Sequence, residues 1–127
     1  MKKYNKYGLT AIKALKVYKA EESLRESWFL ATVAYFNSES SQNKSCPRST
    51  FLGLCEEGLI KDISKGEYNS NSTINKNHAI EAVTYLKENK VESISTKELW
   101  SKLNIGNKSH NSQMDVVLAL WYTDLII

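Results

Sequence analysis

At 127 residues, with 42% hydrophobic residues, 24% charged residues and a net charge of +3, the chain has the composition of an ordinary globular domain. These values exclude a disordered or fibrous chain, and the length suits one domain, residues 1–127, that buries roughly two thirds of its unfolded surface. One proline and five glycines are too few for the many turns of a β-sandwich. The sequence therefore predicts an all-α fold, a compact bundle of five to six helices.

Apolar residues at helical spacing predict the first three helices. One covers Leu9 to Lys19, and the next covers Glu22 to Phe36. The second is apolar around so much of its circumference that we expect it to be the central helix. After a polar loop over residues 37–45, Pro47 suits a first helical turn and Gly58 suits a helix end, so a third helix is expected between them.

Three more helices are expected in the second half of the chain, after an irregular polar segment over residues 61–75. Each follows a capping residue: Asn75, Ser95, and Asn111 or Ser112. Two of these caps, Ser95 and Ser112, have an acid three residues later that would complete a capping box. The three helices are expected to extend to about Asn89, Leu103 and Asp124.

The two halves of the chain, residues 9–60 and 77–126, resemble each other. Residues 51–60 align with residues 117–126, and the same four apolar residues recur in the same order. The alignment predicts two three-helix units around a pseudo-two-fold axis, with Trp28 and Trp100 buried at related positions. Chance similarity between amphipathic helices is the alternative explanation.

The N-terminus is basic, since residues 1–20 contain six lysines and no acid. Such a patch suits contact with nucleic acid or an anionic surface, or is simply a solvated face. Lysine outnumbers arginine by 15 to 2, which disfavours direct base reading because arginine makes the commonest specific base contact. No long apolar run follows, so neither a signal peptide nor a membrane span is expected, and the predicted location is the cytoplasm.

Polar residues gather at two predicted helix starts, over residues 44–50 and 108–113. The first combines two cations, three hydroxyls and free backbone donors, which are the parts of an anion site. The second would face it if the two halves are symmetric, forming one groove that receives an anion or a peptide. Ordinary helix capping is the alternative. The candidate ligand-binding residues are Lys44, Cys46, Arg48, Ser49, His110, Asn111 and Gln113.

Enzyme chemistry has little support in the sequence. Cys46 and His110 would supply the thiol and the base of a cysteine-dependent enzyme, but no third orienting residue is evident. Cys46, Cys55, His78 and His110 lack the close paired spacings of metal ligands, and phosphate-loop and hydrolase motifs are absent. No cofactor and no metal are expected, and Cys55 is expected to pack in the core.

Several motifs resemble a small bacterial and phage family of unknown function. They are SSQ at residues 40–42, CPR at 46–48, FLGLCEEGLI at 51–60 and HNSQMDVVLALW at 110–121. The resemblance covers nearly the whole chain. It implies no activity, cofactor or partner, but it does imply that the two polar helix starts belong to the family pattern.

The sequence alone leaves the function unknown and favours a non-enzymatic binding or regulatory module, whose ligand is an anionic group or a partner protein. Weak nucleic-acid binding by a helix-turn-helix-like unit is the alternative, disfavoured because the third helix is apolar and ends in Glu56 and Glu57. A cysteine-dependent enzyme comes third. The apolar C-terminus, residues 125–127, is a candidate homodimer contact.

Overall fold

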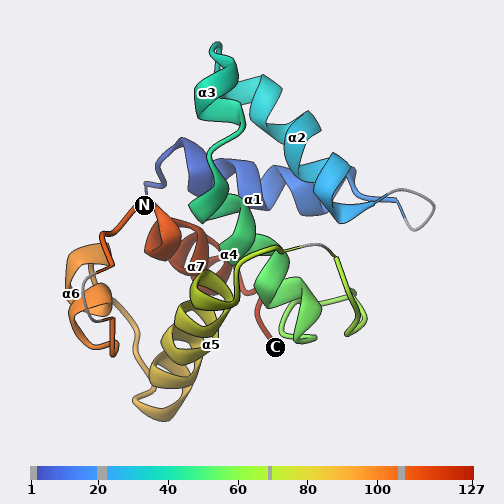
Figure 1. The fold of residues 1–127 in the computed structure, drawn as a ribbon. Coiled ribbons are helices and arrows are strands. Elements are labelled where there is room, and N and C mark those ends of the chain that lie inside the picture. Colours follow the sequence, from blue (N-terminus) through green and yellow to red (C-terminus); the bar gives the residue numbers. More distant parts are fainter. Residues whose placement is uncertain (1–2, 20–22, 69, 106–107) are drawn as a thin grey trace.

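Seven α-helices are present in the computed structural model, which describes residues 3–19, 23–68, 70–105 and 108–127 (Figure 1). Among these residues the only β-structure is an isolated antiparallel bridge between Ile60 and Ile126. The predicted all-α class is therefore confirmed. The helices are α1 (Lys6–Val17), α2 (Leu24–Tyr35), α3 (Glu39–Gln42), α4 (Ser45–Glu56), α5 (Thr73–Glu88), α6 (Thr96–Ser101) and α7 (Gln113–Tyr122).

Six of these helices correspond to the predicted ones, with shifted ends, and α3 is additional. It forms within the polar loop because the Ser38 hydroxyl accepts a hydrogen bond from the backbone N–H of Ser41 at 3.2 Å. In the same way Ser72, rather than Asn75, caps α5. The second capping box does not form, because Ser112 has a left-handed backbone (φ 67°) and its side chain makes no cap hydrogen bond.

The central helices are α4 and α7, and not the helix over residues 22–36 as predicted. Every residue of α4 from Ser49 to Glu56 is buried, and so are Met114 and residues 116–120 of α7. Figure 1 shows α4 and α7 crossing in the middle, with α1 and α2 on one side and α5 on the other. The outer face of α2 is instead exposed at Leu30 (60%) and Val33 (65%).

Two glycines let pairs of helices approach closely. A Cβ atom at Gly53 of α4 would lie 2.8 Å from the Cβ of Lys76 in α5, and one at Gly8 of α1 would lie 3.0 Å from the Cβ of Ala119 in α7. These contacts correspond when the alignment is extended by one residue before each half, since Gly8 then pairs with Lys76 while Gly53 pairs with Ala119. This correspondence supports the internal repeat, which stays a prediction.

The C-terminal ends of α4 and α7 also match. Gly58 and Asp124 both have left-handed backbones, with φ of 71° and 61°. Beyond them the two chain segments exchange a reciprocal pair of hydrogen bonds, from Lys61 N to Leu125 O and from Ile127 N to Leu59 O, each 2.9 Å long. The apolar C-terminus is thus largely used inside the fold. Trp28 is fully buried as predicted, whereas Trp100 is only partly buried.

The carboxylate of Glu56 holds the end of α4, the following loop and α5 together. It accepts hydrogen bonds from the backbone N–H groups of Tyr68 (2.9 Å) and Ser70 (3.2 Å) and from the ammonium group of Lys76 (3.2 Å). Desolvation by itself raises the pKa of this carboxyl, but the hydrogen bonds outweigh it and lower the pKa to about 2. Glu56 is therefore ionised and stabilises the fold.

We expect Gly53→Ala to destabilise the protein by about 1–3 kcal/mol, because the added methyl group would overlap the backbone and side chain of Lys76. Gly66→Ala is the matched control, since its Cβ would meet mainly the flexible end of Tyr68 at 3.3 Å. Urea unfolding followed by circular dichroism measures both. Equal stability of the two variants would contradict the close packing of α4 on α5.

We expect Glu56→Gln to destabilise the protein by about 2 kcal/mol at pH 7, because the ion pair with Lys76 is lost and only weaker neutral hydrogen bonds remain. The folded pKa is below the ordinary value of 4.5, so the stabilisation is complete above pH 4.5 and is lost as the pH falls toward about 2. Urea unfolding at pH 7 and at pH 3 measures this. A difference between variant and parent that stays the same at both pH values would contradict the role of the charge.

Candidate functional site

The start of α4 and the segment before α7 lie side by side, as the sequence predicted for the two polar clusters. The ammonium group of Lys108 lies 3.7 Å from the sulfur of Cys46, 62 residues away in the chain. Lys44 is close enough to His110 for its positive charge to affect the pKa of that imidazole. We call Lys44, Cys46, Lys108 and His110 the cationic cluster.

Lys44 and Lys108 have no carboxylate partner among the described residues. The ion pairs found among those residues are formed by Lys61 and Lys76. The ammonium group of Lys44 lies over the ring of Tyr7, 5.6 Å from its centroid. This contact orients the lysine but does not neutralise it. The cluster therefore contains two lysines that form no ion pair among the described residues.

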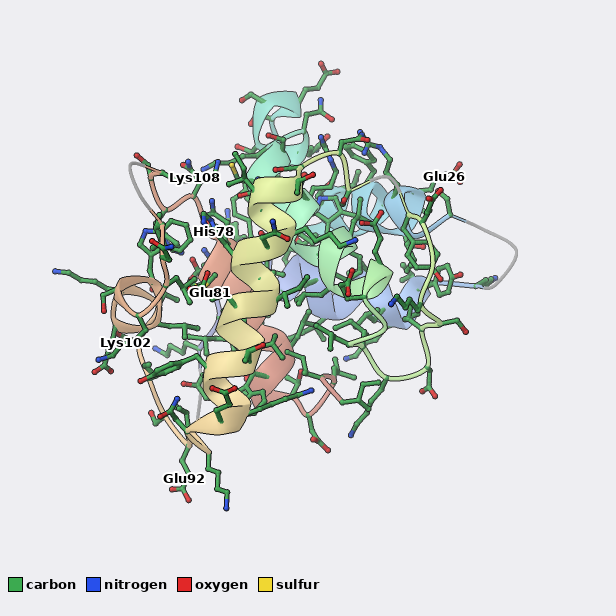
Figure 2. All side chains as sticks on the ribbon, turned by 60° about the horizontal axis from the view of Figure 1, so that its bottom comes forward. Glu26, His78, Glu81, Glu92, Lys102 and Lys108 are labelled. Carbon is green, nitrogen blue, oxygen red and sulfur yellow. The ribbon has the colours of Figure 1, made fainter. Side chains whose placement is uncertain are left out.

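Trp100 lies between the two histidines of the chain. Its ring centroid is 5.4 Å from that of His78, in an edge-on arrangement, and 5.0 Å from that of His110. Figure 2 shows His78 and Glu81 on the side of α5 that faces α6, with Lys108 next to His78. The cationic cluster is thus backed by side chains from α5 and α6.

Both histidines are held in the neutral form by their surroundings. Burial lowers the pKa of His78, with a further lowering by Lys108 that Glu81 opposes. Burial likewise lowers the pKa of His110; to smaller extents, Asp115 raises this pKa and Lys44 lowers it further. His78 is 7% exposed, and its Nδ1 has no hydrogen-bond partner.

His110 also caps α7. Its Nε2 accepts a hydrogen bond from the backbone N–H of Met114 at 3.1 Å, which replaces the missing side-chain cap of Ser112. Asp115 follows in the first turn, and burial raises the pKa of its carboxyl while His110 opposes the change. The imidazole therefore has a structural role as well as a place in the cluster.

Three of the predicted site residues are engaged in hydrogen bonds within the fold. Ser49 is 2% exposed and donates to the backbone carbonyl of Ser70 at 2.6 Å. Gln113 is fully buried, donates to the Asn75 side chain at 3.2 Å and accepts from the backbone N–H of Asn111. These bonds hold the two helix starts in place.

Arg48 is turned toward α2 instead of His110. Its guanidinium carbon lies 5.2 Å from the ring centroid of Phe29, and its Nη1 donates to the carbonyl of Asn43 at 3.2 Å. Burial and the nearby charge of Arg25 lower its pKa. The structure therefore brings together Lys44, Cys46 and His110 of the predicted set but leaves Arg48 outside.

Sequence reasoning missed His78 and Trp100 as parts of the site and did not select Lys108. His78 lies in α5, distant in the chain from both polar clusters. Trp100 lies in α6, a short distance before the second cluster, but no local spacing pattern connects it with the site. The one available signal was that the chain has only two histidines.

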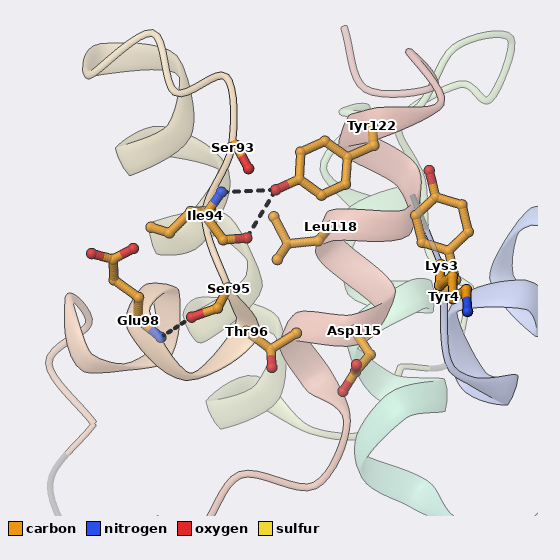
Figure 3. A pocket seen from close by; sticks show the side chains of 10 residues that line it. All are labelled: Lys3, Tyr4, Ser93, Ile94, Ser95, Thr96, Glu98, Asp115, Leu118 and Tyr122. Carbon is orange, nitrogen blue, oxygen red and sulfur yellow. Dashed lines mark hydrogen bonds between the residues drawn. The ribbon is translucent and has the colours of Figure 1, made fainter. Parts of the chain in front are cut away.

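The largest of the described cavities, about 510 Å³, lies elsewhere, between α7, the start of α6 and the N-terminal segment (Figure 3). Much of its polar lining is already hydrogen-bonded: the Tyr122 hydroxyl binds the backbone of Ile94, and Ser95 caps α6. This cavity includes no residue of the cationic cluster, whose four side chains are partly buried.

The arrangement offers little to a thiol enzyme or a metal. The sulfur of Cys46 contacts Lys108, and the Nε2 of His110 is occupied by Met114. In the part of the chain that the structure describes, no group of three or more His, Cys, Asp or Glu side chains could hold a metal ion. None of the described helices is long and apolar enough to cross a membrane.

Comparison with known proteins gives one match. A family model described as "Family of unknown function (DUF6979)" matches residues 4–127. No curated protein and no solved structure matches the chain. The motifs had indicated a family of unknown function, and its bacterial and phage origin stays a prediction. Because the matched region includes nearly the whole sequence, the chain belongs to this family of unknown function, DUF6979.

Proposed function

We propose that this protein is a non-enzymatic binding module that holds an oxyanion, the carboxylate or phosphate group of a ligand or partner peptide, at the cationic cluster. The observation that carries the proposal is that two lysines without a carboxylate partner among the described residues reach this cluster: Lys108 contacts the sulfur of Cys46 at 3.7 Å, and the charge of Lys44 acts on His110. Both positive charges would attract an oxyanion at the cluster.

The backbone at the same place favours an anion. Among the described helices, only α4 and α7 lack a side-chain hydrogen bond at the N-cap. The first backbone N–H groups of α4 are therefore left for water or a ligand, and the helix dipole adds positive potential there. Together with the two lysines, these donors would favour an oxyanion by about 1–3 kcal/mol.

The burial of α4 is an argument against the helix-turn-helix alternative. A recognition helix has to present its side chains to the major groove of DNA. In α4 the residues from Ser49 to Glu56 are all buried, and the last of them is an ionised carboxylate. Nucleic-acid contact would then depend on the lysines of α1 and would be weak and salt-sensitive.

We expect Lys44→Ala and Lys108→Ala each to weaken the binding of sulfate, used as the probe oxyanion, by about fivefold, because each removes one charge from the site. Titration followed by ¹H–¹⁵N nuclear magnetic resonance should shift the signals of Ser45, Cys46 and the Trp100 indole. Lys102→Ala is the matched control, since Lys102 is exposed at the end of α6. If Lys102→Ala reduced the sulfate-induced signal shifts as much as the two site variants do, the proposal would be contradicted.

We expect sulfate to bind more tightly as the pH falls below the usual histidine value of about 6.5, because protonated His78 and His110 add positive charge. Both pKa values are lowered, so the increase should come mainly below pH 6.5. The free energy of unfolding should instead decrease as the pH falls, while the affinity for sulfate increases. Protonation favours the unfolded state for a group whose folded pKa is depressed, so stability is full above pH 6.5 and falls below it.

Sulfate titrations and urea unfolding at pH 7.5 and 5.5 measure the two effects. Glu56 stays ionised over this range because its pKa is about 2. His110→Gln is the control, since glutamine still accepts a hydrogen bond from Met114 but does not titrate, and it should reduce the pH dependence of both quantities. An affinity that is the same at both pH values would count against a role for the histidines.

A further inference from the structure

A carboxylate in the largest of the described cavities has no charged partner. Asp115 of α7 lines this cavity of about 510 Å³, together with residues of the N-terminal segment and of the start of α6 (Figure 3). Its carboxylate forms no ion pair among the described residues. Burial raises the pKa of this carboxyl, and the opposing effects of His110 and of its own backbone N–H are smaller. A cationic group placed here would offset the desolvation of the carboxylate.

The same cavity is lined by an ammonium group of opposite charge. Lys3 is exposed and forms no ion pair with Asp115 or with any other residue that the structure describes. The two charges therefore line one cavity without bonding to each other. A molecule that carries both an ammonium group and a carboxylate can pair with both, with its ammonium group on Asp115 and its carboxylate on Lys3.

The rest of the lining suits the other parts of such a molecule. The Thr96 hydroxyl forms no hydrogen bond with another described residue and can accept one from a bound ammonium group. Ile94, Leu118 and the ring of Tyr4 supply apolar surface. The Tyr122 hydroxyl donates to the backbone carbonyl of Ile94 at 2.8 Å and accepts from its N–H at 2.9 Å, so this wall is fixed in place.

We propose that this cavity binds a small zwitterion, a free amino acid with an apolar side chain. Its ammonium group contacts Asp115 and Thr96, its carboxylate contacts Lys3, and its side chain lies against Ile94 and Leu118. Cavities of roughly 300–1,000 Å³ with apolar walls and a few polar groups are typical of small-molecule sites. The proposal is independent of anion binding at the cationic cluster, because no residue of that cluster lines the cavity.

Ligands with a single charge fit this lining less well. A simple amine would leave Lys3 without a partner, and its positive charge would be repelled by that lysine. A simple carboxylic acid would be repelled by Asp115 and by Glu98, the second acid that lines the cavity. Only a ligand with both charges pairs with each of them.

L-Leucine is the probe, and two of its derivatives are matched controls. N-acetyl-L-leucine lacks the ammonium group and L-leucinamide lacks the carboxylate, whereas both keep the apolar side chain. In ¹H–¹⁵N nuclear magnetic resonance titrations of the full chain, L-leucine should shift the amide signals of Thr96 and Leu118 with a Kd on the order of 1 mM. Each derivative should bind at least about tenfold more weakly, because it leaves one charge of the cavity without a partner.

Two variants assign the two ends of the ligand. Asp115→Asn should remove the preference for L-leucine over N-acetyl-L-leucine, and Lys3→Gln should remove the preference over L-leucinamide. Asp62→Asn and Lys97→Gln are the matched controls, since both residues are exposed and neither lines the cavity. Asparagine also tolerates the left-handed backbone of Asp62, whose φ is 66°.

Circular dichroism checks that each variant folds, and if Asp115→Asn does not fold, Lys3→Gln with its control decides. Absence of signal shifts at about 50 mM L-leucine would overturn the proposal. So would equal binding of L-leucinamide and L-leucine to the parent protein, because the cavity would then recognise amines without a carboxylate. A loss of L-leucine binding that is as large in Asp62→Asn and Lys97→Gln as in the cavity variants would also overturn it.

Discussion

Because α4 is buried along most of its length, its polar groups have to be satisfied by other parts of the protein, and this requirement organises the fold. Glu56 accepts hydrogen bonds from the loop at Tyr68 and Ser70 and from Lys76 of α5. Gly53, one turn earlier, lets α5 come close enough for that ion pair to form. The end of α4 is thereby fixed, and its first turn, where the cationic cluster lies, is held on the same rigid helix.

Helical periodicity predicted which segments are helices but not which of them is central. The helix over residues 22–36 has more apolar residues around its circumference than α4, yet Leu30 and Val33 are exposed while Ser49 and Thr50 are buried. A hydroxyl can be buried where a backbone carbonyl accepts its proton, as Ser70 does for Ser49 and Cys46 for Thr50. These carbonyl acceptors are either distant in the chain or available only in the folded conformation. The pattern of polar residues along the sequence therefore could not predict that Ser49 and Thr50 are buried. The same reason explains α3, which depends on the local cap at Ser38.

The sequence predicted that the two polar helix starts lie side by side, in agreement with the contact between Cys46 and Lys108, but it could not give the direction of each side chain. Cys46 and Arg48 are two residues apart, which is about 200° around a helix. Cys46 therefore points to Lys108 and Arg48 to Phe29, on different sides of α4. Helix geometry could have separated these two residues in advance. The contributions of His78 and Trp100 depend on how α5 and α6 pack, which no local pattern contains.

The lysines and the arginines lie in different surroundings, each of which suits the chemistry of its side chain. Lysine is a compact, strongly hydrated charge, suited to an oxyanion at the exposed start of a helix, whereas arginine stacks on Phe29 and tolerates partial desolvation. The first turn of α4 contributes to both places, with Cys46 in the cationic cluster and Arg48 against Phe29. Since Gly53 and Glu56 fix α4 against α5, a ligand on the Cys46 side has no soft movement of the helix through which to displace Arg48. Anion binding at the cationic cluster is therefore expected to leave the contact of Arg48 with Phe29 unchanged.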